Sequence, residues 1–171
     1  MAIHEIRLIP DPALKQACQP VSEIDDGILR LMDDMLDTMY DAPGIGLAAP
    51  QIGVFKRVVV MDVAEKGADP APMRLINPEI LWTSEDLVTT QEGCLSVPEQ
   101  YADVTRPAQV RIAYLDETGT RRELEGDGIL SVCIQHEIDH LDGVLFTDHL
   151  STLKRNMIMR KVAKWKKGRA A

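Results

Sequence analysis

The sequence predicts an α+β fold in which mostly antiparallel β-sheets pack around a central helix, with one helix before the strands and an amphipathic helix at the C-terminus. Helical spacing of apolar residues occurs in three segments, residues 25–40, 128–141 and 151–167. Extended segments rich in β-branched residues lie between the first two. The turn sequence D-E-T-G at 116–119 joins two of these extended segments into a hairpin.

The N-terminal part predicts two helices. Residues 11–18, which follow Pro10, suit a short helix. In residues 25–40, isoleucine, leucine, methionine and tyrosine recur at helical spacing, so one face of this longer helix should contact a core. The segment A-P-G-I-G at 42–46 should end it, because proline and glycine interrupt regular structure.

The middle of the chain predicts strands. The β-branched run R-V-V-V-M-D-V at 57–63 indicates a buried strand. After a loop at 66–72, residues 73–80 predict a strand that Pro78 should interrupt, and residues 87–91 predict another.

The hairpin follows and leads into the last two helices. Apolar and polar residues alternate in 109–115, and residues 121–125 should return beside them after the turn. Residues 128–141 predict an apolar, buried helix. Residues 151–167 predict an amphipathic helix with an apolar stripe and a basic face.

Length and composition favour a globular domain. With 171 residues, 45% of them hydrophobic and 27% charged, we expect one catalytic domain over 1–150 and a C-terminal tail over 151–171. The N-terminus has no signal-peptide pattern, no apolar run is long enough to span a membrane, and three cysteines indicate reduced thiols, so we expect a cytoplasmic protein.

Charge is distributed unevenly along the chain. From Lys154 onward there are eight basic residues and no acidic one, which leaves 11 basic against 27 acidic residues in the rest of the chain. An acidic body argues against binding to DNA, and nothing indicates a membrane partner. The basic tail suits an anionic surface.

The motif H-E-I-D-H predicts a metal site. His136 and His140 are four residues apart on a predicted helix, so both imidazoles can reach one ion. Glu137 lies about 100° around the helix from His136, where its carboxylate can act on a water molecule beside the metal.

A catalytic metal needs a third protein ligand, and the residues leave its identity open. The extended motif that ends in a third histidine fails because Phe146 occupies that position, and no glutamate follows Glu137. His149 lies nine residues after His140, a spacing that matches no known third metal ligand. Cys94 lies in T-T-Q-E-G-C-L-S-V-P, where irregular backbone can aim a side chain at a site, while Cys133 suits a helical core position.

Two other functions are therefore alternatives. A general H-E-x-x-H metallopeptidase or aminopeptidase is one. A non-catalytic zinc-binding domain, in which Cys133 or His149 completes a closed site, is the other.

Three segments resemble the signature motifs of the peptide deformylase family, in the order and spacing of that family. They are G-I-G-L-A-A-P-Q at 44–51, E-G-C-L-S at 92–96 and Q-H-E-I-D-H at 135–140. The resemblance covers nearly the whole chain and is to the bacterial, iron-dependent class with a helical C-terminal tail. It implies that the protein removes the formyl group from the N-terminal formylmethionine of nascent polypeptides.

The resemblance also implies the catalytic residues. Cys94, His136 and His140 would bind one metal ion per chain, Fe²⁺ in the family, with Zn²⁺, Co²⁺ or Ni²⁺ as substitutes. Glu137 would activate a metal-bound water. The side-chain amide of Gln51 and the backbone N–H of Leu95 would stabilise the oxyanion.

Further family positions imply how the substrate binds. The residues at these positions are Ile45, Gly46, Gly93, Ile129, Val132 and Cys133, some of which pair with the peptide backbone while others form a pocket for the methionine side chain. Glu92 and Arg106 match a pair that braces the metal loop. Tyr101 departs from the family, in which an arginine contacts the substrate beyond methionine. Asp139 and Asp142 are left without an assigned role, and the basic tail implies docking on the ribosome.

Overall fold

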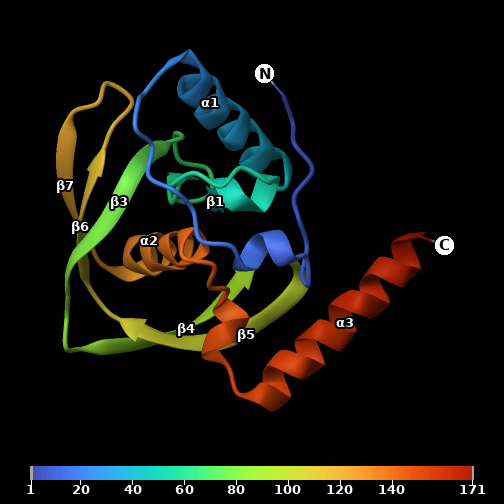
Figure 1. Ribbon diagram of the computed structural model, residues 1–171. Helices are drawn as coiled ribbons and strands as arrows, with labels where there is room; N and C mark the ends of the chain where they lie inside the picture. Colours follow the sequence, from blue (N-terminus) through green and yellow to red (C-terminus); the bar gives the residue numbers. More distant parts are fainter. Residues whose placement is uncertain (1, 171) are drawn as a thin grey trace.

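The computed structural model describes residues 2–170 and contains a five-stranded antiparallel sheet (Figure 1). The strand order in this sheet is β1-β2-β3-β6-β7. The strands span Gly46–Ala48 (β1), Val58–Met61 (β2), Met73–Thr83 (β3), Val110–Leu115 (β6) and Arg121–Gly126 (β7). The predicted hairpin is β6 and β7, which pair from Val110 opposite Gly126 to Leu115 opposite Arg121.

Both faces of this sheet are covered by helices. Helix α1 spans Asp26–Asp41 and helix α2 spans Gly128–Leu141, which confirms the two predicted helices to within one residue. Val58 and Val60 of β2 face the core beside α1, whereas Val59 and Met61 face the core beside α2. All four strand residues are buried because side chains alternate across a strand, which explains the continuous apolar run.

A second, two-stranded sheet holds β4, Leu87–Cys94, against β5, Val97–Pro107. Figure 1 shows α2 near the centre of the molecule, with β1 above it and these two strands below it. The α+β fold built around α2 is therefore as predicted. The sequence pattern did not predict β1 or β5, and it ended β4 three residues early.

Two further predictions are wrong in detail. The helix expected over 11–18 is a single 3-10 turn, Pro12–Lys15, which is capped by the Asp11 carboxylate at 2.9 Å from Ala13 N. Pro78 does not interrupt β3, because a register shift between Ile76 and Glu79 accommodates the residue that cannot donate a hydrogen bond.

The C-terminal helix α3, Thr152–Ala170, follows a 3-10 turn, Phe146–His149 (η3), and extends along the outside of the molecule (Figure 1). Ile158 and Val162 are buried in a core cluster with residues of β5 and η3, so this part of the predicted apolar stripe packs on the body. Leu153 and Met157 stay exposed. None of the helices in residues 2–170 combines the length and apolar character that a membrane span requires.

Candidate metal centre

Helix α2 presents His136 and His140 on one face, one turn apart. Their ring centroids are 5.1 Å apart, and both residues are buried. Burial and the nearby His136 hold the pKa of His140 well below the usual imidazole value, so that its ring is neutral at pH 7. A neutral imidazole is the form that binds a metal ion.

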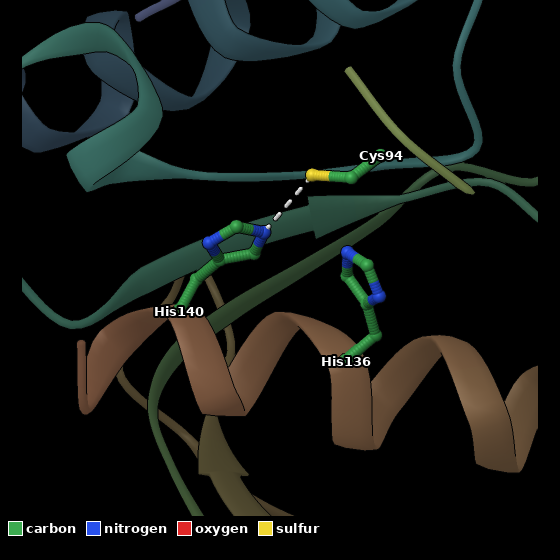
Figure 2. A group of neighbouring side chains, drawn as sticks. All are labelled: Cys94, His136 and His140. Atoms are coloured by element: carbon green, nitrogen blue, oxygen red, sulfur yellow. Dashed lines mark hydrogen bonds between the residues drawn. The ribbon is translucent and has the colours of Figure 1, made fainter. Parts of the chain in front are cut away.

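Cys94 reaches the two histidines from β4. The sequence placed this cysteine in irregular backbone, but it is the last residue of the strand, next to a register shift that follows Gly93. Its Sγ lies 3.3 Å from Nε2 of His140, and Figure 2 shows all three side chains pointing toward one another. Within residues 2–170 this is the one group of its kind, with ligand atoms no more than 4.8 Å apart.

The two competing third ligands lie elsewhere. Sγ of Cys133 faces the backbone oxygen of Ile45 at 3.8 Å, and burial raises the pKa of this thiol well above its usual value. His149 is hydrogen-bonded to Asp139 at 2.9 Å. Neither residue joins the metal group, so residues 2–170 bring together three candidate ligands and no fourth.

Glu92 and Arg106 hold His136 in place. Oε1 of Glu92 accepts a hydrogen bond from His136 Nδ1 at 2.9 Å, and Arg106 binds the same carboxylate through two N–H groups at 2.6 and 2.9 Å. Burial alone would raise the pKa of Glu92, but the bonds from His136 and Arg106 lower it to about 2. The ionised carboxylate can only accept, so the His136 proton is on Nδ1 and Nε2 is left free to bind a metal.

Glu137 is buried beside the metal group. Its Oε1 lies 4.0 Å from His136 Nε2, and its Oε2 has no hydrogen-bond partner among the described residues. Burial raises the pKa of Glu137 to about 7. A carboxyl group with a pKa near 7 suits both proton acceptance and proton donation.

Gln51 is buried and its amide is held at both ends. Oε1 accepts a hydrogen bond from Ala48 N at 2.9 Å, which directs Nε2 toward Ser96 Oγ at 3.0 Å and Cys94 Sγ at 3.5 Å. The sequence did not single out Ser96, although it lies in the E-G-C-L-S motif. The N-terminal segment ties both motifs together, since Arg7 N donates to Gln51 O and Ile9 N donates to Ser96 O.

A cavity of about 1040 Å³ opens beside the metal group and reaches Cys94, His136 and Glu137. All six predicted substrate-binding residues line it: Ile45, Gly46, Gly93, Ile129, Val132 and Cys133. Leu95 also lines it, and its side chain packs closely over Gly44. Tyr101 covers Gly93, where a Cβ atom would lie 2.5 Å from the tyrosine ring. The structure therefore brings the predicted substrate residues to one surface.

Asp139 is the residue of this region whose role the sequence did not assign. Its Oδ2 accepts a hydrogen bond from Arg106 Nη1 at 2.9 Å and another from His149 Nε2 at 2.9 Å. Asp142 instead accepts a hydrogen bond from Arg57 Nη1 at 2.8 Å. The position of Asp139 within H-E-I-D-H indicated a residue close to the site. Its role could not be predicted, because its partners Arg106 and His149 are 33 and 10 residues away in the sequence.

The donor set fits a catalytic metal ion. One thiol and two imidazoles form a three-ligand group that leaves a fourth position for water in tetrahedral geometry. A buried polar atom beside this group, Glu137 Oε2, has no hydrogen-bond partner in residues 2–170. Polar atoms without partners are rare in protein interiors, and an unpaired carboxylate oxygen at this place fits a water molecule beside a bound ion.

Comparison with known proteins gives one consistent result. Residues 3–156 match the family model for polypeptide deformylase. The peptide deformylase of Phenylobacterium zucineum (strain HLK1) is 58% identical over 164 residues, which cover 96% of this chain and 97% of that protein. The enzyme of Rhizobium meliloti (strain 1021) is 51% identical over 171 residues, which cover 100% of this chain and 98% of that protein.

Solved structures agree. The crystal structure of peptide deformylase from Ehrlichia chaffeensis superposes with a TM-score of 0.95 at 37% identity and covers 99% of this chain and 100% of that one. A crystal structure from the same organism in complex with actinonin superposes with a TM-score of 0.92 at 40% identity, over 96% of this chain and 98% of that one.

Proposed function

The chain belongs to the peptide deformylase family, and from that premise we propose which of its residues carry out the reaction and which metal they bind. The reaction is metal-dependent hydrolysis of the formyl group at the N-terminus of nascent polypeptides that begin with formylmethionine. The observation that carries the proposal is the convergence of Cys94, His136 and His140 beside the buried carboxyl group of Glu137.

Cys94, His136 and His140 would bind one Fe²⁺ ion per chain, with Zn²⁺, Co²⁺ or Ni²⁺ as substitutes. A mixed thiolate and imidazole set accepts all four ions. When bound, the metal supplies Lewis-acid chemistry, which lowers the pKa of water and polarises the formyl carbonyl. If Fe²⁺ is native, protein purified without oxygen should contain iron and lose activity in air. Full and stable activity of air-purified protein that contains only zinc would contradict this assignment.

Glu137 accepts the proton of the attacking water and then donates it to the amine that leaves. Support comes from its burial, from its position on the cavity and from a pKa raised to about 7 by burial. Such a group can hold the proton between the two transfers at neutral pH.

Gln51 Nε2 and the backbone N–H of Leu95 stabilise the negative charge that develops on the formyl oxygen. Support for Gln51 is the orientation of its amide, whose Oε1 is bonded to Ala48 N and whose Nε2 points toward Cys94. A donor held in place in advance needs no reorganisation during the reaction, and removing one typically costs about 2.7–4 kcal/mol.

The substrate peptide pairs with the protein backbone at Ile45 and Gly93, and its methionine side chain enters the pocket formed by Ile45, Ile129, Val132 and Cys133. Gly46, next to Ile45, leaves space for the catalytic carboxylate, because a Cβ atom there would lie 2.6 Å from Glu137 Oε1. Pairing through the backbone does not depend on the side chains of the substrate, so peptides with many different sequences after the methionine are accepted.

The replacement of Glu137 by Gln tests these assignments. We expect Glu137→Gln to retain the metal and the fold but to lose about 10²–10⁴-fold in kcat on formyl-Met peptides, because it cannot carry the proton. Glu85→Gln, a change of the same kind at an exposed position, is the control. Unblocked peptides and internal amides serve as comparison substrates. Unchanged turnover by Glu137→Gln, or preferred cleavage of the internal amides, would contradict the proposal.

A second proposal concerns location and partner. The protein would act in the cytoplasm, with residues 1–150 as the catalytic domain, and the C-terminal tail, residues 151–171, would dock on the ribosome. The observation in favour is the basic surface of α3, where Arg160, Lys164 and Lys167 are exposed. Cations of this density suit RNA phosphates.

Ribosome docking is best tested by charge reversal, because deleting the tail would also remove Ile158 and Val162 from the core. A variant with Arg160, Lys164 and Lys167 changed to Glu should lose salt-sensitive cosedimentation with ribosomes. The control reverses three exposed cations on the body: Arg30, Lys56 and Lys66. Equal cosedimentation of both variants would refute docking through α3.

A further inference from the structure

A line of hydrogen bonds runs from the buried His136 to the exposed His149. His136 is bonded to Glu92, Glu92 to Arg106, and Arg106 to Asp139, each at 2.6–2.9 Å. Asp139 is bonded in turn to His149 at 2.9 Å. The side chain of Arg106 is 5% exposed and that of His149 is 38% exposed, so the line leads from the interior to solvent.

The protons along this line follow from the chemistry of the carboxylates. An ionised carboxylate only accepts hydrogen bonds, so His149 must donate through Nε2–H to Asp139. Arg106 Nη1 donates to the same oxygen, Oδ2. Arg106 is therefore held between two carboxylates. Its Nη1 is bonded to Asp139, and its Nε and Nη2 are bonded to Glu92.

Asp139 would be less constrained without His149. The side chain of Asp139 is 27% exposed, so water could compete for its carboxylate. Without a second donor the Asp139 carboxylate could rotate away from Arg106. The hydrogen bond from His149 opposes this rotation and keeps Oδ2 facing Arg106. The orientation of Arg106 then fixes the carboxylate that orients the His136 ring.

The same 3-10 turn also contacts His136 directly. Phe146, the first residue of η3, is 1% exposed, and its ring stacks on that of His136 with centroids 6.1 Å apart and planes 24° apart. His149 is the last residue of η3. The turn is anchored because Asp148 accepts a hydrogen bond from Leu145 N at 2.9 Å and pairs with Lys15. The same turn thus contacts His136 directly through Phe146 and is connected to it through His149.

We propose that His149 is a positioning residue for the metal ligand His136, which acts through Asp139, Arg106 and Glu92. It binds neither metal nor substrate. The inference rests on the proposed assignment of His136 as a ligand. Groups that orient a metal-binding histidine typically contribute about 10–100-fold to metal affinity, and His149 lies at the far end of such a line, so we expect an effect near the lower limit.

His4 provides a matched control for a test of His149. Its side chain is 39% exposed and is bonded to an aspartate, Asp34, at 3.2 Å, on a part of the chain that contains none of the metal-site residues. His149→Ala, His149→Gln and His4→Ala are loaded with Co²⁺ without oxygen. The Co²⁺ dissociation constant is measured against a chromophoric chelator, and the visible Co²⁺ spectrum is recorded.

We expect His149→Ala to weaken Co²⁺ binding by about tenfold and to shift the visible bands. His149→Gln keeps an N–H donor and should restore both, and His4→Ala should match the wild type. If His149→Ala does not fold, His149→Leu replaces it and must show the same loss relative to His149→Gln. Equal affinity and equal spectra for the alanine variants at 149 and 4 would refute the inference.

The Cys94→Ala variant tests the proposed metal site separately from the proposed role of His149. If Cys94→Ala binds Co²⁺ as the wild type does, the proposed metal site is wrong and the role of His149 is refuted with it. If Cys94→Ala loses Co²⁺ while His149→Ala does not differ from His4→Ala, the metal site stands and only the role of His149 is refuted.

Discussion

Gly46 faces the carboxylate of Glu137, and adding one methyl group there tests how closely that carboxylate must be placed. A Cβ atom at Gly46 would lie 2.6 Å from Glu137 Oε1 and 3.0 Å from Cys133 Sγ, whereas ordinary contact begins at 3.4 Å. The Gly46→Ala variant must therefore move the carboxylate by about 0.8 Å or move β1 away from α2. Because Glu137 borders the cavity, we expect the carboxylate to move into it.

The expected effect is on kcat. A displacement near 1 Å at a reacting group can cost about 100-fold, which corresponds to about 2.7 kcal/mol in the activation free energy. Deformylation of a formyl-Met peptide under steady-state conditions measures kcat and KM, and elemental analysis measures bound metal. We expect kcat to fall by about 100-fold with the metal content unchanged, because the three atoms nearest the added methyl belong to Glu137 and Cys133, which are not proposed ligands.

Two further variants decide what causes the loss. Gly168→Ala adds the same methyl where no atom lies within 4 Å, so it should leave kcat unchanged. Gly46→Ala combined with Cys133→Ala removes the sulfur contact but keeps the carboxylate contact, and its kcat should stay about 100-fold below that of the wild type. Wild-type kcat for Gly46→Ala would refute the reasoning, and recovery in the double variant would show that the sulfur contact was the cause.

Three other predictions follow from the structure. Gln51→Ala should lower kcat/KM by about 10²–10³-fold with metal retained, because it removes a proposed oxyanion donor; a loss below tenfold in the peptide assay would rule out that role. Gly143→Ala should lower the melting temperature by about 6–12 °C, since its φ is 75° and a Cβ atom would lie 2.4 Å from Lys15 O. An unchanged calorimetric Tm would show that the backbone adapts. The bond to Asp62 and, above all, burial raise the pKa of Tyr40 from 10 to about 12, so the unfolded chain releases this proton first and stability falls as pH rises from 10 to 12. Urea midpoints across that window should fall less for Tyr40→Phe, and parallel curves for the two proteins would contradict the shift.

The sequence predicted those parts of the fold that depend on local pattern. Helices α1 and α2 and the β6–β7 hairpin have a clear period and clear ends, so their bounds agree with the structure to within about a residue. Strand β5 was missed because V-P-E-Q-Y-A-D-V is polar and contains a proline, and its conformation comes from pairing with β4. Pairing between strands depends on the partner and leaves a weak local signal.

The residues of the candidate site could be predicted from the sequence alone. The spacing of His136 and His140 places two imidazoles on one face of a helix, and the motifs name Cys94 and Gln51. Which of these groups meet depends on the tertiary structure. Cys94 and His140 are 46 residues apart, and Cys133 turns toward Ile45 instead of toward the histidines. His149, a rejected third ligand, lies at the end of the line of hydrogen bonds that leads to His136. Helical periodicity is encoded locally, whereas contacts between distant residues exist only after the sheets have packed around α2.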